Sequence, residues 1–335
     1  MISFMIIGIN GFGRIGRCIA RLAISNSKIQ KIHVNDLAGQ SDLMHLLKYD
    51  SIHGSLKFSF EYKNNDIVFE NGTILSFSKQ AQPKNIPWKK SGAEIILECT
   101  GRFLSEQTAK DHFIGGAKKI ILSAPAKDET IPSIVLGINN EKITPDKSLF
   151  SNASCTTNCA APLVSVINNL SKINACNIST IHSFTSVQNI HDAPHKDLRR
   201  ARAASLSIIP TSTGAVKAIE QIFPDLKNKV SGGCFRVPVA NGSITEIILS
   251  TENNLSIEEI NKAMKKAANG HLKGILGYTE EPIVSTDIIG SKYSSIYDAQ
   301  LTSSANKLIK ISGWYDNEMG YSNRMLDLAF IIHQK

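Results

Sequence analysis

The chain has 335 residues, of which 42% are hydrophobic and 20% charged, and its net charge is +8. This length is sufficient for two domains with separate cores, and no apolar run is long enough for a membrane helix, so we expect no membrane partner. The positive charge permits anionic ligands, but no RNA-binding or helix-turn-helix pattern accompanies it, so we expect no obligatory nucleic-acid partner. The scattered cysteines argue against a disulfide framework and against a metal site of the zinc-finger kind.

The first predicted element is an apolar strand at residues 4–9, followed at once by Gly11, Gly13 and Gly16 in G-x-G-x-x-G spacing. Apolar residues then recur at helical spacing. A strand before these glycines and a helix after them is the context of a dinucleotide site, where the backbone turns tightly and approaches a pyrophosphate. No basic segment precedes the strand, so we predict no signal peptide and a cytoplasmic protein.

A second apolar segment, residues 29–34, leads to the acidic Asp36, at the distance after Gly16 where such sites carry their acidic residue. Its carboxylate can accept hydrogen bonds from a ribose and would repel a 2′-phosphate. These features predict dinucleotide binding, with NAD favoured over NADP. The alternative is a glycine turn in an α/β protein that binds no phosphate.

Further strands are predicted at 95–97 and 120–122, with a helix at 109–113 between them. Alternating strands and helices favour a parallel, doubly wound sheet. Ligands of such sheets bind at the carboxyl ends of the strands, which makes Thr100 and Ser123 candidates for the cofactor site.

The stretch SNASCTTNCAAP at residues 151–162 places Cys155 just before a run of helical apolar periodicity, so a helix should begin at or near this cysteine. Unpaired N–H groups and the helix dipole lower the pKa of a thiol in that position. A thiolate is a nucleophile, which suggests acyl-transfer or thiohemiacetal chemistry. The alternative is that Cys155 is a small buried side chain.

His182 lies in a strand predicted over residues 177–184 and is a residue type that can exchange the proton of a thiol. Nothing local distinguishes it from the other histidines of the chain. Beyond it, a loop with Thr213 and Gly214 precedes a helix that starts near Ala215, and such a loop can hold a phosphate. Arg236 could add a bidentate contact, so we expect a phosphorylated substrate.

The later part of the chain is rich in strands, at 235–250 and 308–314. It also contains an amphipathic helix at 257–268, with Ser256 as its N-cap, and an apolar C-terminal helix at 325–333. The change of pattern predicts a domain boundary near residues 150–155.

Taken together, the chain resembles the phosphorylating glyceraldehyde-3-phosphate dehydrogenases over almost its whole length. The resemblance rests on segments at residues 9–17 (INGFGRIGR), 45–54 (HLLKYDSIHG), 123–128 (SAPAKD), 151–159 (SNASCTTNC), 195–204 (HKDLRRARAA), 210–218 (PTSTGAVKA), 235–238 (FRVP) and 314–324 (WYDNEMGYSNR).

This resemblance implies a Rossmann-type doubly wound parallel sheet in a dinucleotide-binding domain at residues 1–153. It implies an α+β catalytic domain with a large, mostly antiparallel sheet at 154–318, and a C-terminal helix at 319–335 that packs back on the dinucleotide-binding domain. It also implies a homotetramer, in which residues 185–202 reach a neighbouring subunit's cofactor site.

The implied reaction is the NAD-dependent oxidation and phosphorylation of glyceraldehyde 3-phosphate by inorganic phosphate. Cys155 would be the nucleophile and His182 the proton acceptor. The resemblance implies cofactor contacts at Arg14, Ile15, Asp36 and Asn317. It implies ligands of the two phosphates at Thr185, Arg236, Ser154, Thr156, Thr213 and Gly214.

The chain departs from the family pattern at Val239–Gly242 and lacks an arginine often seen in the adenine pocket. Three other functions remain as alternatives. An erythrose-4-phosphate dehydrogenase shares the cysteine motif but lacks the Ser212–Gly214 loop. A surface- or nucleic-acid-binding protein would use the net charge, and a regulatory NAD-binding module would need only the first half.

Overall fold

The computed structural model describes residues 4–335, which divide into two compact units. The first unit holds the chain up to Ile134 together with Asn140–Ala153 and Ser322–Lys335. The second holds Val135–Asn139 and Ser154–Tyr321. The chain therefore leaves the first unit, builds the second, and returns to the first with its last residues.

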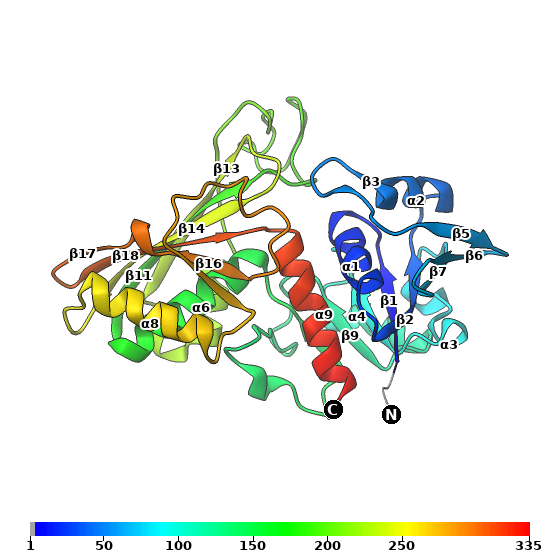
Figure 1. Ribbon diagram of the computed structural model, residues 1–335, viewed down its shortest axis with the longest axis horizontal. Helices are drawn as coiled ribbons and strands as arrows, with labels where there is room; N and C mark the ends of the chain where they lie inside the picture. The colour runs from blue at the N-terminus through cyan, green and yellow to red at the C-terminus, as the bar shows by residue number, and fades with distance from the viewer. Residues whose placement is uncertain (1–3) are drawn as a thin grey trace. The chain divides into compact units, whose positions relative to one another are not determined.

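The first unit is built on one large, mostly parallel sheet. Its strands are β1 (Met5–Asn10), β2 (Ile29–Asn35), β5 (Phe60–Lys63), β6 (Asp66–Phe69), β7 (Ile74–Ser78), β8 (Ile95–Glu98), β9 (Lys119–Leu122) and β10 (Leu149–Ser151). They are ordered β10-β9-β8-β1-β2-β7-β6-β5 (Figure 1), parallel from β10 to β7 and antiparallel at the β6–β5 edge. The predicted doubly wound parallel sheet is confirmed. A separate small ribbon pairs β3 (Tyr49–Asp50) with β4 (Gly54–Ser55).

Short helices connect these strands. They are α1 (Arg14–Ile24), α2 (Gln40–Lys48), α3 (Trp88–Ser91), α4 (Glu106–Ala109) and α5 (Asp111–Ile114), with 3₁₀ turns at Pro83–Asn85 and Asn140–Lys142. The helix predicted at 109–113 is instead two helices, because Lys110 ends α4 and precedes α5. Ser105 starts α4 through a capping box with Thr108, a signal that lies before the apolar pattern.

The core of the first unit consists of the central strands, whose side chains are buried on both faces. Every residue of β8 is buried, and Ile7 and Ile9 of β1 have no exposed surface. Parallel strands covered on both faces are apolar throughout and do not alternate. This is why residues 95–97 and 120–122 are uninterrupted runs of isoleucine and leucine.

The second unit contains a mixed sheet. Its strands are β11 (Ile173–Ser183), β12 (Ile209–Thr211), β13 (Val230–Val237), β14 (Ser243–Thr251), β15 (Leu276–Thr279), β16 (Ser295–Asp298), β17 (Ser303–Ala305) and β18 (Leu308–Tyr315). Their order is β12-β13-β11-β14-β18-β16-β15, with β17 beside β18. Most pairs are antiparallel, as predicted, but β11–β13 and β15–β16 are parallel.

Helices cover this sheet on one side, where Figure 1 shows α6 and α8. The helices of the second unit are α6 (Cys155–Leu170), α7 (Ala215–Ile222) and α8 (Ile257–Asn269), with 3₁₀ turns at Pro224–Leu226 and Ala299–Leu301. The last helix, α9 (Met319–His333), begins in the second unit and belongs to the first from Ser322 on. In α8 the predicted N-cap is confirmed: Ser256 Oγ accepts a hydrogen bond from the N–H of Glu259, whose carboxylate accepts one from the N–H of Ser256. Strand β14 alternates buried and half-buried residues, as expected for a sheet with one covered face.

The C-terminal helix begins earlier than the apolar pattern indicates. The apolar pattern predicts the helix from Met325, whereas the resemblance implies a helix at 319–335. Helix α9 starts at Met319, because Asp316 Oδ1 accepts hydrogen bonds from the N–H groups of Glu318 and Met319, at 2.9 and 2.8 Å. No helix within residues 4–335 has the length and apolar character needed to cross a membrane.

Helix α6 packs so closely on β18 that the contact requires a glycine. A Cβ atom at Gly313 would lie 2.3 Å from Ser295 Oγ and 2.8 Å from a methyl carbon of Leu163, both buried. We predict that Gly313→Ala lowers the free energy of unfolding by about 1–3 kcal/mol, because the helix must move away from the sheet. Urea denaturation of the purified protein measures this change.

The matched control is Gly233→Ala on β13 of the same sheet, where the nearest atom to an added Cβ is Thr211 O at 4.0 Å. It should change the free energy of unfolding by less than about 0.5 kcal/mol. Equal effects of the two substitutions would contradict the packing argument.

Candidate functional site

The predicted nucleophile is the first residue of α6. Ser154 is its N-cap, and Ser154 Oγ accepts a hydrogen bond from Thr157 N at 3.0 Å. Before it, Ala153 has φ +54°, a left-handed conformation that costs a non-glycine residue about 1 kcal/mol. The predicted helix start at Cys155 is confirmed, so the backbone around the thiol is fixed by a strained turn and a capped helix.

Cys155 faces His182, which lies near the end of β11. The distance between Cys155 Sγ and His182 Nε2 is 3.4 Å, within hydrogen-bond range for sulfur. The thiol is half-buried and the imidazole is almost wholly buried. The two predicted catalytic residues are therefore adjacent, although 27 positions separate them in the chain.

Two groups lie against the other ring nitrogen of His182. His182 Nδ1 is 2.7 Å from the carbonyl oxygen of Ser183 and 2.5 Å from Arg236 Nη1. Arg236 reaches this point because it is the register partner of His182 across the parallel β11–β13 pair. Arg236 Nη1 also donates to the Ser183 carbonyl oxygen at 3.0 Å, so Nδ1 faces one donor and one acceptor. The tautomer with a proton on Nδ1 donates to Ser183 and leaves the Nε2 lone pair facing the thiol. In that tautomer the imidazole is a base for the thiol proton.

The electrostatics of this pair favour the neutral forms. Burial raises the pKa of the Cys155 thiol above its ordinary value, although the charge of Arg236 and the N–H of Thr156 act in the opposite direction. Burial and the adjacent Arg236 lower the pKa of His182 to about 3. The prediction that the helix N-terminus gives Cys155 a lowered pKa is therefore wrong for this structure, because loss of solvent around the thiolate outweighs the helix end.

Apart from Arg236, the predicted phosphate ligands of the second unit belong to three segments. Thr213 Oγ1 accepts a hydrogen bond from Ala215 N at 3.2 Å, and Gly214 is exposed immediately before α7. Thr185 is half-buried just after β11. Thr156 is buried with its hydroxyl 3.1 Å from the hydroxyl of Tyr315, and both this hydroxyl and the backbone N–H of Thr156 interact with the Cys155 thiol.

Arg200 is a residue that the sequence pattern did not single out within its cationic run. Its Nε and Nη2 atoms donate to Thr211 Oγ1 at 2.8 and 2.6 Å. Thr211 ends β12 and precedes the Thr213–Gly214 loop. Arg200 therefore brings a positive charge to the start of the predicted phosphate loop, and only the folded chain shows which arginine of the run does so.

Asn317 lies between β18 and α9 and is 6% exposed. Its Oδ1 atom accepts hydrogen bonds from the hydroxyls of Ser183 and Ser243, at 2.8 and 2.9 Å. Asn317 is thus joined to the strand that carries His182. Neither serine was expected from the sequence.

In the first unit the three glycines form the turn between β1 and α1. Gly11 has φ +92°, and a Cβ there would lie 2.8 Å from Thr100 N. A Cβ at Gly16 would lie 2.2 Å from Gly11 O, whereas Gly13 has no heavy atom within 4 Å of its Cβ position. Gly11 and Gly16 are thus needed for the tight turn, and Gly13 leaves open space in front of the helix N-terminus, where a pyrophosphate would approach.

The acidic residue and the arginine beside this turn already have partners. Asp36 Oδ2 accepts a hydrogen bond from Phe12 N at 2.7 Å, and its Oδ1 accepts one from Ala38 N at 2.9 Å. Arg14 binds Asp50 through two hydrogen bonds of 2.6 and 3.0 Å and helps to lower the pKa of that carboxyl to about 2. Because the Arg14 side chain is engaged in this way, we expect Arg14 and Ile15 to reach a cofactor through their backbone.

Thr100 is held by a buried carboxylate that the sequence did not single out. Glu98, fully buried at the end of β8, accepts hydrogen bonds from Thr100 N at 2.8 Å, from the Thr100 hydroxyl, and from Asn10 Nδ2 at 2.6 Å. His112 Nε2 lies 3.0 Å from the same carboxylate, and His112 Nδ1 accepts from the indole N–H of Trp88. The backbone N–H of Ser123 donates to Glu98 O.

The hydrogen bonds continue along the carboxyl ends of the next strands. Asn35 donates to Asn10 at 2.8 Å, and Ser78 donates to Asn35 at 2.9 Å. Because the hydroxyl hydrogen of Ser78 is used in the bond to Asn35, Ser78 Oγ accepts a hydrogen bond from His33 Nε2, 3.1 Å away. Burial lowers the pKa of His33 to about 4, so its Nδ1 atom accepts from Ser76. In this row, which runs from Ser76 through His33, Ser78, Asn35 and Asn10 to Glu98, each residue donates a hydrogen bond to the next.

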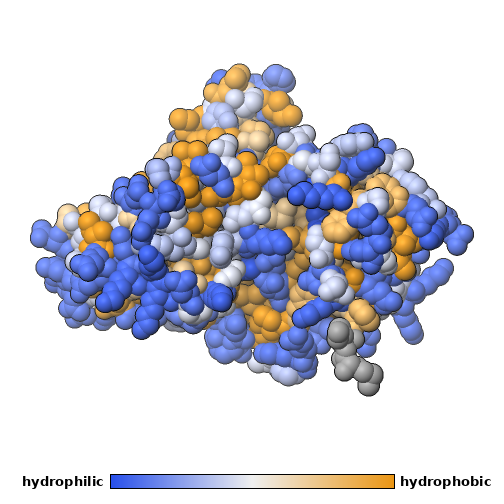
Figure 2. All heavy atoms as spheres, in the orientation of Figure 1, coloured by the Kyte–Doolittle hydropathy of each residue, from blue (hydrophilic) through white to orange (hydrophobic). Residues whose placement is uncertain are grey.

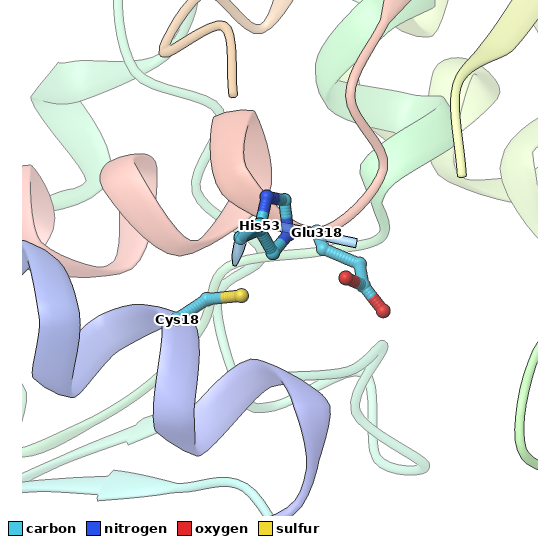
Figure 3. A group of neighbouring side chains, drawn as sticks. All are labelled: Cys18, His53 and Glu318. Atoms are coloured by element: carbon cyan, nitrogen blue, oxygen red, sulfur yellow. The ribbon is translucent and has the colours of Figure 1, made fainter. Parts of the chain in front are cut away.

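The first unit also brings together Cys18 of α1 and His53 of the turn after β3. A ring nitrogen of His53 and the thiol sulfur lie within 4.8 Å of one another (Figure 3). Figure 3 also draws Glu318, which belongs to the second unit. Two ligands in one unit are fewer than the three or four that protein zinc sites take, so we assign no metal ion to this pair.

Comparisons with known proteins match both the segment with the glycine turn and the segment with Cys155 and His182. Residues 5–106 match the model of the NAD binding domain of glyceraldehyde 3-phosphate dehydrogenase, and residues 154–317 match the model of its C-terminal domain. The chain is 48% identical to glyceraldehyde-3-phosphate dehydrogenase of Geobacillus stearothermophilus and 47% identical to glyceraldehyde-3-phosphate dehydrogenase 1 of Bacillus cereus, over 98% of each chain. It is 46% identical to the Mycolicibacterium smegmatis enzyme, over 97% of this chain and 98% of that one.

The dinucleotide turn and the cysteine–histidine pair, together with these matches, define an NAD-dependent oxidoreductase. More particularly, the chain belongs to the glyceraldehyde-3-phosphate dehydrogenase family. The family resemblance predicted from the sequence is confirmed.

The position of Arg236 predicts a pH effect on Cys155. In Arg236→Leu the thiolate loses a positive charge that lowers the pKa of the thiol, while burial remains. The pH profile of Cys155 alkylation by iodoacetamide should therefore move to higher pH, with slower alkylation at neutral pH. Arg236→Lys, which keeps the charge, should stay nearer the wild type.

A Cys155→Ser background measures alkylation of the other five cysteines and is subtracted. The argument fails if Arg236→Leu is alkylated faster at neutral pH, or if its profile coincides with that of the wild type.

Proposed function

We propose that Cys155 and His182 carry out the oxidation and phosphorylation of glyceraldehyde 3-phosphate. The observation that carries the proposal is the 3.4 Å contact between Cys155 Sγ and the basic nitrogen of a neutral His182. As Sγ bonds to the aldehyde carbon, the thiol proton moves to His182 Nε2 and from there to the aldehyde oxygen, which becomes the hydroxyl of a thiohemiacetal.

The second half of the reaction uses the same two residues. Bound NAD supplies the acceptor for the hydride that leaves the former aldehyde carbon. His182 Nε2 takes the hydroxyl proton, which leaves a thioester on Cys155. An oxygen of inorganic phosphate then attacks the thioester carbon and the C–S bond breaks, with the Cys155 thiolate as the leaving group. The acyl phosphate 1,3-bisphosphoglycerate departs, and the proton on His182 Nε2 returns to the thiolate.

The polar groups around this pair supply the two phosphate sites of the proposal. Thr185 and Arg236 hold the phosphate of the substrate. Ser154, Thr156, Thr213 and Gly214 hold inorganic phosphate. The support is that Arg236 lies beside His182 and that Arg200 adds positive charge next to the Thr213–Gly214 loop.

We assign cofactor contacts to residues of the first unit and to one residue of the second. In the first, the Gly11–Gly16 turn receives the pyrophosphate, Asp36 the ribose, and Thr100 and Ser123 line the site at the strand ends. In the second, Asn317 binds the nicotinamide carboxamide. The proposed domain limits are 1–153, 154–318 and 319–335.

We further propose a homotetramer with a contact at an apolar loop surface. This surface is made of residues that are 60–82% exposed, namely Val187, Ile190, Leu198, Leu206 and Ile208. Figure 2 shows apolar residues gathered over the loops at the top of the view, where Figure 1 draws this part of the chain. Large exposed apolar patches mark interaction sites, and symmetric assembly buries them.

All six cysteines are free, which supports a cytoplasmic location that cell fractionation would test.

The reaction is tested by following NADH formation with glyceraldehyde 3-phosphate, with and without phosphate. We expect continuous turnover with phosphate and, without it, one NADH per Cys155 followed by a stop, because the thioester has no acceptor. Cys155→Ser should lose roughly three orders of magnitude in rate or more.

Cys159→Ser is the matched control, since Cys159 is a buried thiol of the same helix that contacts Ser295. It should keep phosphate-dependent turnover. Continuous turnover without phosphate, or higher activity on erythrose 4-phosphate, would overturn the proposed reaction.

The tetramer is tested by light scattering. Wild type should have the mass of four chains, and Leu198→Asp with Leu206→Asp should give smaller species, because charges on the apolar loop surface oppose burial. Ile114→Asp, at an apolar residue of the first unit that is 70% exposed, is the control and should leave the mass unchanged. A wild-type mass of one chain would contradict the proposal.

A further inference from the structure

The amide of Asn317 is held by two serines whose hydroxyl hydrogens are both committed to it. Ser183 Oγ and Ser243 Oγ donate to the same Asn317 Oδ1 atom, at 2.8 and 2.9 Å. A carbonyl-type oxygen has two lone pairs, so these two bonds saturate it. Ser243 Oγ also accepts from Ser183 N at 3.2 Å, which ties the end of β11 to the start of β14.

The nitrogen of the same amide, Asn317 Nδ2, makes no hydrogen bond to the described residues. Among residues 4–335, none accepts a hydrogen bond from Asn317 Nδ2, although the side chain is more than nine-tenths buried. An amide nitrogen only donates. The site therefore offers a fixed donor to a ligand and calls for a hydrogen-bond acceptor in that ligand.

We propose that Ser183 and Ser243 are positioning residues that keep the amide nitrogen of Asn317 outward, so that the site selects the carbonyl oxygen of the nicotinamide carboxamide. The proposal rests on the proposed role of Asn317 in cofactor binding. Without the serines, the amide can turn its oxygen outward and present an acceptor to the same carbonyl. The ring would then lose a hydrogen bond and its fixed orientation.

Ser183 also holds the catalytic base, through a different atom. Its carbonyl oxygen accepts from His182 Nδ1 at 2.7 Å, while its hydroxyl serves Asn317. Ser183→Ala removes only the hydroxyl and keeps the carbonyl. The two effects are therefore separable: cofactor affinity should change while proton transfer at Cys155 should not.

The test measures binding by titration calorimetry for NAD and for pyridine adenine dinucleotide, an analogue without the carboxamide. Ser183→Ala and Ser243→Ala should each weaken NAD binding by about fivefold to tenfold. Neither should alter binding of the analogue, which also reports that the site is folded. The pH profile of Cys155 alkylation should be the same in Ser183→Ala as in wild type.

Thr180→Val is the matched control. Thr180 is a buried hydroxyl of β11 that pairs with Thr245 and does not contact Asn317, so this variant should bind NAD as wild type does. If the wild type prefers NAD to the analogue but the serine variants keep that preference, the positioning role is wrong and the cofactor proposal stands. If the wild type binds NAD and the analogue equally, the assignment of Asn317 itself fails, and this inference fails with it.

Discussion

The parallel pairing of β11 with β13 is the constraint on which the second unit's chemistry depends. This register places Arg236 opposite His182, and the guanidinium then lies against the Nδ1 side of the imidazole. The surrounding burial and this charge keep the ring neutral, and the Ser183 carbonyl is the acceptor for a proton on Nδ1. A neutral ring with its free lone pair toward Cys155 is what the thiol needs, because burial has made the thiol a weak acid. Loss of solvent thus raises the pKa of the thiol and lowers that of the imidazole, and the charge of Arg236 lowers both.

In the first unit the corresponding constraint is a buried hydrogen-bond network around Glu98. Hydrogen bonds from Trp88 and His112 on one side, and from the row of His33, Ser78, Asn35 and Asn10 on the other, all run toward the Glu98 carboxylate. Since these groups stand at or near the carboxyl ends of adjacent strands, the row fixes the edge of the sheet at which dinucleotides bind in this fold. Buried polar groups that are fully paired specify one arrangement, and the Thr100 backbone is held as part of it.

Sequence reasoning succeeded where the signal was local. The glycine turn, the start of α6 at Cys155 and the Ser256 cap follow from residues next to one another in the chain, and the structure has all three. It failed where the cause was tertiary. The thiol pKa depends on burial by segments far away in sequence, and the hydroxyls on Asn317 come from two other strands. The start of α9 is an intermediate case. Its cap, Asp316, is a local signal, but it precedes the apolar residues from which the helix start was read.

The discontinuous path of the chain has a consequence for how the protein is made. Both ends of the described chain belong to the first unit, and the second unit is an insertion between Ala153 and Ser322, apart from Val135–Asn139. On a ribosome strands β1 to β10 of the first unit emerge before the second unit, whereas its last segment follows directly on strand β18 of the second unit. Domains form during synthesis as their residues emerge, so the first unit stays incomplete while the second is made. The dinucleotide-binding unit, although it is translated first, can be completed only after Ser322–Lys335 has left the exit tunnel.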